Sequence, residues 1–103
     1  MNAYRLLIRP EAAREVDQAA RWYDARQRGL GPEFLRSFRA AADALRRNPL
    51  IYQNVTGDAR RVLLRRFPYS IFYEVHGSDV VILACFHEAR DPEDWQRRVT
   101  EGP

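Results

Sequence analysis

Hydrophobic positions in the first half of the chain follow two helical patterns that a short strand precedes. Residues 4–8 (YRLLI) predict a strand, and the Pro10 that follows is suited to the first turn of a helix. A break at residues 29–32 separates the two helical patterns, and Asn48-Pro49 ends the second. Two helices joined by so short a break predict an antiparallel helical hairpin. The side chains expected to be buried are Ala12, Val16, Ala19, Ala20 and Tyr23, then Phe34, Leu35, Phe38, Ala41, Ala42 and Leu45.

The second half of the chain changes to the period of two that strands show. After an irregular stretch at residues 50–58, a strand is predicted at residues 61–65. The next strand alternates and places on one face Tyr69, Ile71, Tyr73 and Val75. A turn at residues 76–79 leads to residues 80–86, which are apolar on both faces, as is typical of a central strand. Asp91-Pro92 predicts the start of a last helix, which Trp95 is expected to pack onto the sheet.

These elements predict an α+β fold with the order β-α-α-β-β-β-(α). The helical hairpin is expected to cover one face of a small, mostly antiparallel sheet and to leave the other face open. The 103 residues, 46% of them hydrophobic, suffice for one core, so we expect a single domain over residues 1–103. A single cysteine, Cys85, excludes an internal disulfide and is expected to be buried. No stretch has the apolar length of a signal peptide or a membrane span, so we expect a cytoplasmic protein without a membrane partner.

Arginine residues are concentrated in the segment from Arg60 to Tyr73. The formal net charge is only +3, but all 17 basic residues are arginine, which suits phosphate and carboxylate partners. The alternative explanation for the absence of lysine is codon usage in a GC-rich genome, and composition alone does not separate the two. The placement says more, because Arg60, Arg61, Arg65 and Arg66 fall within seven residues. With Tyr69 and Tyr73 interleaved, they predict a binding surface for RNA or for an acidic peptide. The alternative is a solvated face.

A second group of polar residues follows the predicted central strand. His87, Glu88 and Arg90 are types that act as base, orienting group and phosphate clamp in RNA cleavage. Their spacing has no strict signature, so a structural or surface role is the alternative. The two histidines and one cysteine lack metal-ligand spacing, and we expect no metal or cofactor. Trp22 lies between the two faces of its helix and is either a boundary residue or a partner contact.

Several segments resemble the RelE/ParE superfamily of bacterial toxins. The run of residues 61–75 (RVLLRRFPYSIFYEV) is similar to the middle strands of that superfamily, as are the turn, the apolar strand and residues 87–95 (HEARDPEDW). Residues 19–23 (AARWY) and 31–35 (GPEFL) are similar to its two-helix part. The resemblance extends from about residue 4 to residue 98.

The resemblance implies a toxin of a type II toxin–antitoxin pair, of the plasmid stabilisation kind, and it leaves the target open. RelE-like members are ribosome-dependent mRNA endonucleases, and ParE-like members poison DNA gyrase. Ser70 stands where RelE carries a basic residue, and this favours the ParE-like, growth-inhibiting function, for which no catalytic residue is assigned. The alternative is an endonuclease that uses Arg61, Arg65, His87, Glu88 and Arg90. A third possibility is a non-toxic binding module that keeps the fold.

The partner implied by the resemblance is a cognate antitoxin, in a toxin–antitoxin hetero-oligomer. Its expected seats are the grooves along the helical hairpin and the edge of the sheet, where arginines would meet acidic antitoxin residues. The other partner is the target, DNA gyrase or the ribosome with its mRNA. The residues expected to bind partners are Arg60, Arg61, Arg65, Arg66, Tyr69, Tyr73, Trp22 and Arg90.

Overall fold

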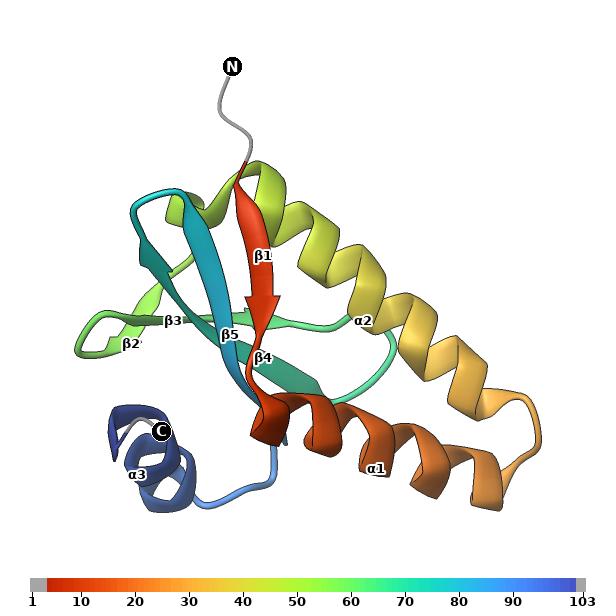
Figure 1. The fold of residues 1–103 in the computed structure, drawn as a ribbon. Coiled ribbons are helices and arrows are strands. Elements are labelled where there is room, and N and C mark those ends of the chain that lie inside the picture. Colours follow the sequence, from red (N-terminus) through yellow and green to blue (C-terminus); the bar gives the residue numbers. More distant parts are fainter. Residues whose placement is uncertain (1–3, 102–103) are drawn as a thin grey trace.

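The computed structural model describes residues 4–101 as helices packed on a five-stranded mixed sheet (Figure 1). The elements in chain order are β1 (Arg5–Ile8), α1 (Pro10–Arg26), α2 (Leu30–Arg47), the 3₁₀ helix η1 (Pro49–Ile51), β2 (Asn54–Thr56), β3 (Ala59–Leu63), β4 (Tyr69–His76), β5 (Asp79–His87) and α3 (Pro92–Glu101). The strand order is β1-β5-β4-β3-β2. Only β1 runs parallel to its neighbour, and the other pairs are antiparallel. The predicted α+β fold is confirmed, with β5 as a central strand.

The helical hairpin depends on a tight contact where α2 begins. The predicted break at residues 29–32 was too long, because α2 starts at Leu30 and includes Gly31 and Pro32 in its first turn. Pro32 is tolerated in the first turn, since its missing amide hydrogen would have no helical partner there. Gly31 is required for a different reason: a Cβ atom on it would lie 2.9 Å from the Ala20 carbonyl oxygen and 3.0 Å from the Asp24 Cβ. The Asp24 carboxylate accepts hydrogen bonds from the Gly29 and Gly31 amides at 2.9 and 3.1 Å, which satisfies donors that a helix start leaves free.

The main core lies between the hairpin and one face of the sheet. It contains the predicted apolar stripes of both helices together with the alternating side chains of β4. At its wide end, aromatic rings meet edge to face, with Tyr23 and Phe67 centroids 4.9 Å apart and Phe34 and Tyr69 centroids 5.1 Å apart. Such pairs stabilise beyond the area that they bury. Cys85 is buried in the same core, as predicted.

The opposite face of the sheet is partly covered, whereas the sequence led us to expect it open. Helix α3 lies apart from the helical hairpin, across the sheet (Figure 1). The Trp95 ring stacks on Phe72 with centroids 4.8 Å apart, and Val99 is buried beside them. The packing role predicted for Trp95 is thus confirmed. An alternating strand has two faces, and its period alone does not tell which of them a later helix covers.

An extra residue in β5 changes which way its second half faces. Phe72 pairs with Ala84 and the next residue, Tyr73, pairs with Ile82, so Leu83 is unpaired and forms a bulge. Leu83 and Ala84 therefore both face the α3 side, where they join its core cluster. Beyond the bulge, Cys85 returns to the helix side.

The stretch expected to be irregular contains the edge strand β2. It pairs with the start of β3 through a turn in which Gly57 has the left-handed φ of 53°. Strand β3 accordingly begins at Ala59 and ends at Leu63, two residues earlier at each end than predicted. Arg65 and Arg66 thus lie in the loop to β4 rather than on a strand face. Within residues 4–101, no helix is long and apolar enough to cross a membrane.

Candidate functional site

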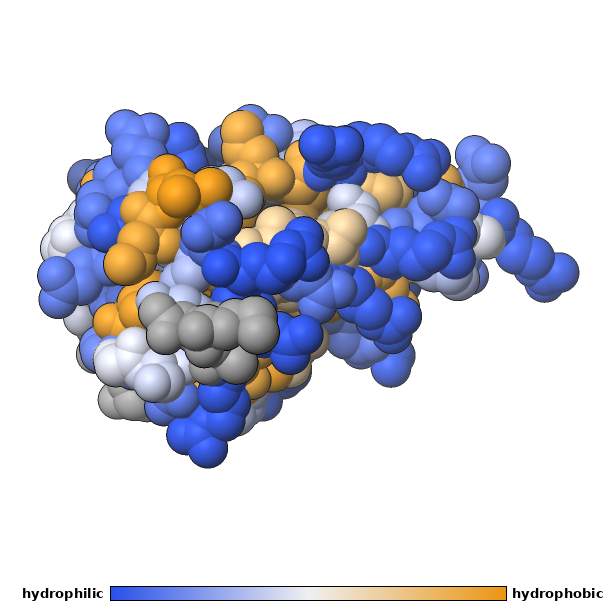
Figure 2. All heavy atoms as spheres, turned by 90° about the horizontal axis from the view of Figure 1, so that it is seen from above, coloured by the Kyte–Doolittle hydropathy of each residue, from blue (hydrophilic) through white to orange (hydrophobic). Residues whose placement is uncertain are grey.

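A groove of about 460 Å³ lies between α2 and β3, and we call it the α2 groove. Small or apolar side chains form its floor: Ala40, Ala41, Ala44 and Val62. Its rim carries the guanidinium groups of Arg36, Arg47, Arg65 and Arg66. An apolar floor with a cationic rim suits an amphipathic segment that is acidic along its edges. Seen from above, the molecule shows hydrophobic side chains gathered on one side and mostly hydrophilic ones elsewhere (Figure 2).

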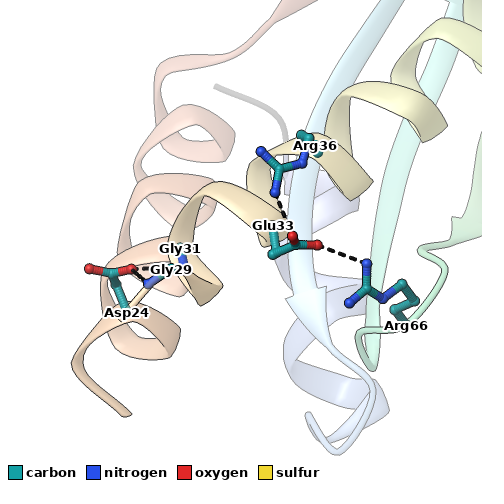
Figure 3. A network of polar contacts seen from close by, with 6 residues as sticks. All are labelled: Asp24, Gly29, Gly31, Glu33, Arg36 and Arg66. Atoms are coloured by element: carbon teal, nitrogen blue, oxygen red, sulfur yellow. Dashed lines mark hydrogen bonds and ion pairs between the residues drawn. The ribbon is translucent and has the colours of Figure 1, made fainter. Parts of the chain in front are cut away.

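Glu33 organises one end of the α2 groove. Its carboxylate accepts a hydrogen bond from Arg36 at 2.5 Å and another from Arg66 at 2.8 Å (Figure 3). The hydrogen bonds from Arg36 and Arg66 lower the pKa of Glu33. The Ser37 hydroxyl donates to the Arg65 carbonyl at 2.6 Å, so a second bond ties the loop to α2. These contacts fix the loop although Arg66 has the unusual φ of 73°.

The remaining cations of the rim are available to a partner. No ion pair joins Arg47 or Arg65 to an acid within residues 4–100, and both side chains are exposed. Of the four rim arginines, Arg65 and Arg66 were predicted from the sequence to bind a partner, and Arg36 and Arg47 were not. Their spacing of eleven residues, about three helical turns, places both on one face of α2 and could have indicated the groove.

Tyr73 is a wrong prediction for a partner contact. Its side chain is completely buried, and its hydroxyl donates to the Pro49 carbonyl at 2.5 Å. Burial raises the pKa of Tyr73 to about 12. The error has a simple cause: Tyr73 shares a face with Ile71, and that face lies under the helices.

Arg60 is likewise engaged inside the molecule. One of its guanidinium nitrogens, Nη1, donates to the Leu50 carbonyl at 3.2 Å and to the Tyr52 carbonyl at 2.6 Å. The side chain is half-buried. Arg60 was predicted to bind a partner, but its guanidinium group instead donates hydrogen bonds to the protein's own backbone.

A second groove, of about 320 Å³, lies between α1 and the end of β5 and is called the α1–β5 groove here. Four predicted residues line it: Trp22, Tyr69, His87 and Arg90. Trp22 is 51% exposed. The His87 ring lies edge to face with Tyr69 at 5.1 Å, and its Nδ1 accepts the Ala89 amide at 2.9 Å. That acceptor role means that Nδ1 carries no proton in this arrangement.

Glu15 lies in the same groove and completes the backbone bonding of β5. Its carboxylate accepts the Cys85 amide at 3.0 Å and pairs with Arg98 of α3 at 3.2 Å. Burial raises the pKa of Glu15, against the opposing effects of these two partners. The carboxylate thus replaces the neighbouring strand that β5 lacks beyond Ile82, where β1 has ended.

The residues proposed for RNA cleavage do not all line one cavity, although His87 borders both the α1–β5 groove and a smaller hollow. Arg61, His87 and Glu88 line a shallow hollow of about 100 Å³ beside Trp95 on the α3 side of the sheet. Arg65 belongs to the α2 groove, and the Arg90 guanidinium lies 4.4 Å over the Phe86 ring.

Ser70 also lines that hollow and is uncharged. Its hydroxyl is the one buried side-chain polar atom without a hydrogen-bond partner in the described part of the chain. No group of three or more potential metal ligands occurs among the described residues.

Comparisons with known proteins bear on the whole of this arrangement. Residues 6–92 match the family described as "ParE toxin of type II toxin-antitoxin system, parDE". A solved structure of a chromosomal ParDE toxin–antitoxin system from P. aeruginosa is similar with a TM-score of 0.75 and 17% identity, over 82% of this chain and 96% of that one. The toxin–antitoxin complex RelBE2 from Mycobacterium tuberculosis is similar with a TM-score of 0.61 and 20% identity, over 87% and 97%. Among curated proteins, none matches.

Proposed function

Because the chain belongs to the family of ParE toxins of type II toxin–antitoxin systems, we propose that it inhibits growth by acting on DNA gyrase and that a cognate antitoxin neutralises it. In this proposal the toxin catalyses no reaction of its own. It binds gyrase and interferes with the enzyme's own cutting and rejoining of DNA.

The separation of the candidate nuclease residues carries the choice of target. General acid–base cleavage of RNA needs its proton donor, its base and its phosphate clamp within hydrogen-bond reach of one bond. Here Arg65 lies in the α2 groove, away from the hollow that Arg61, His87 and Glu88 line. Arg90 lies in the α1–β5 groove, which shares His87 with that hollow but contains neither Arg61 nor Glu88. The uncharged Ser70 lies buried in that hollow. This distribution supports a toxin that acts by binding.

The α2 groove supports an antitoxin as the second partner. Its floor accepts the apolar side of a helix or strand, and Arg47 and Arg65 on the rim are free to pair with carboxylates. A segment that is disordered when free and folds on binding suits such an extended seat. Arg36 and Arg66, which pair with Glu33, line one end of the groove.

One observation favours a ribosome-dependent mRNA endonuclease as the alternative. Arg61, His87 and Glu88 do line one hollow, and they supply a cation, a base and a carboxylate. In that case RNA would enter on the α3 side of the sheet. The hollow of about 100 Å³ holds little more than a phosphate group, so Trp95 and α3 would have to move.

Induced expression with two readouts decides between the targets. A gyrase-directed toxin is expected to induce the response to DNA double-strand breaks while translated mRNA stays intact in primer extension. Codon-linked cuts in mRNA without DNA damage would overturn the proposal in favour of the endonuclease. Unchanged growth with folded protein would count against both. As a control variant, His87→Ala is expected to leave toxicity nearly intact, whereas an endonuclease would lose most of it.

A further inference from the structure

Two large aliphatic side chains point into solvent next to the end of α2. Leu50 is 58% exposed and Ile51 is 68% exposed, and they are consecutive residues of η1. Single exposed hydrophobic residues are common on protein surfaces and need no explanation. Leu50 and Ile51 differ because they are the two most exposed large hydrophobic side chains among the described residues, and they are adjacent.

Side-chain hydrogen bonds from β3 and β4 fix the backbone of residues 49–52. The Tyr73 hydroxyl donates to the Pro49 carbonyl, and Arg60 donates to the carbonyls of Leu50 and Tyr52. Pro49 itself is buried, and its ring restricts the backbone at the start of η1. Bonds from the sheet thus fix the backbone on both sides of the exposed pair. The consequence is that Leu50 and Ile51 stand out on a rigid base, so little backbone entropy is lost when a partner covers them.

The shape and charge of the surroundings indicate the kind of partner. Leu50 and Ile51 line neither the α2 groove nor the α1–β5 groove, so they form a projection rather than part of a seat. A projection needs a concave apolar partner surface, which a folded protein offers and a short disordered segment does not. Arg46 precedes the pair, lies outside the α2 groove, is exposed, and forms no ion pair with an acid within residues 4–100. It suits a carboxylate beside such a pocket.

We propose that Leu50 and Ile51 form a preorganised contact that enters an apolar, acid-rimmed pocket of the toxin's target protein. This inference rests on the proposed function, which makes that protein DNA gyrase. It assigns the two partners to different surfaces, because the antitoxin is placed in the α2 groove. Arg60 and Tyr73 are positioning residues in this view, since they act only through the backbone of η1.

The test uses the full chain and purified DNA gyrase. Gyrase, supercoiled plasmid and ATP are incubated with increasing toxin, and linear DNA from trapped cleavage is measured. The variant Leu50→Ser/Ile51→Ser is compared with Leu7→Ser, a matched change at an exposed residue of β1. Circular dichroism and thermal unfolding check that both variants fold. The single variant Ile51→Glu serves as a second probe, because its charge opposes an acidic rim.

The expected result is at least a tenfold increase in the toxin concentration that gives half-maximal cleavage, for the double variant and for Ile51→Glu. Leu7→Ser should remain within about twofold of the wild type. Equal activity of folded double variant and wild type would overturn the inference and leave the proposed function standing. Wild-type toxin that traps no cleavage would instead overturn the proposed function. A wild-type dimer that the double variant converts to a monomer in sedimentation would show that the contact serves self-association, against the proposal.

Discussion

Arg60 and Tyr73 lie directly opposite each other on β3 and β4, and both side chains donate to the backbone between residues 49 and 52. The sequence predicted that β3 and β4 form a partner surface, but these two side chains of the strand pair bind the protein's own backbone. On that side, one arginine and one tyrosine hold the connection from α2 to β2.

Replacing Tyr73 with Phe removes the buried hydrogen bond to the Pro49 carbonyl and little else. We expect the free energy of unfolding to fall by about 1–2 kcal/mol, because a buried acceptor is left without its donor. Urea denaturation followed by circular dichroism measures the change. Tyr4→Phe is the control, since Tyr4 is only half-buried. If Tyr73→Phe were as stable as the wild type, the hydroxyl would not hold η1.

Alkaline pH should weaken the fold through the same residue. The pKa of Tyr73 is raised from an ordinary value of 10 to about 12 in the folded protein. Its stabilisation is therefore complete below pH 10 and is lost as the pH rises from 10 to about 12. The buried Cys85 thiol, whose pKa is raised from 9 to about 12, acts in the same direction from pH 9 upward. Urea titrations between pH 8 and 11.5 should show this decline, and Tyr73→Phe should flatten its upper part. An equal slope in that variant would contradict the assignment.

Gly31→Ala should destabilise the helical hairpin. Its added Cβ would meet the Ala20 carbonyl oxygen at 2.9 Å, and backbone atoms cannot yield as the end of a flexible side chain can. We expect a loss of about 1–3 kcal/mol, the usual cost of overpacking, in thermal or urea unfolding. Asp24→Ala should cost about 1 kcal/mol by removing the carboxylate that caps α2. The exposed Asp43→Ala is the control. A neutral Gly31→Ala would mean that α2 is free to move away from α1.

Ser70→Ala should not weaken the protein. The hydroxyl is buried without a partner in the described structure, so removing it relieves a desolvation cost of about 1 kcal/mol. The variant should therefore unfold at an equal or higher temperature in calorimetry and keep its toxicity. A clear loss of stability would reveal a hydrogen bond to this hydroxyl. A loss of toxicity alone would place Ser70 in a functional site on the α3 side.

Charge reversal on the rim of the α2 groove should release the toxin from its antitoxin. Arg47→Glu/Arg65→Glu places two carboxylates where the proposed acidic segment would sit. We expect at least tenfold weaker antitoxin binding, with reduced dependence on salt concentration, in titration calorimetry. Arg39→Glu, on the same helix but outside the groove, is the matched control. Unchanged affinity of the double variant would move the antitoxin to another surface.

The fold was predictable because its signals are local. Apolar residues at helical spacing, Pro10 and the alternation of Tyr69, Ile71, Tyr73 and Val75 are each readable without knowledge of their neighbours. They locate the elements to within a few residues. They also show which side chains of a strand share a face.

The candidate site was harder to predict because it depends on which face is covered and on which backbone groups lack partners. The strand period put Tyr69 and Tyr73 together, but only the packing reveals that their face is the one under the helices. Likewise, nothing in the sequence states that the carbonyls near Leu50 need the guanidinium of Arg60. The α2 groove joins α2 to a loop about thirty residues away, so its rim could not be assembled from neighbouring sequence letters.

The unpaired Leu83 shifts the alternation of side chains in β5 by one residue. Every side chain after it points to the side opposite the one that strict alternation from Val80 would give. The His87 ring thereby packs against Tyr69, on the helix side, and the residue also borders the hollow beside Trp95. A relative that lacked this one residue could keep each amino acid of the strand's end and still turn the same histidine toward α3. Comparisons among such toxins should therefore align the end of this strand by register, because identical letters there can belong to opposite surfaces.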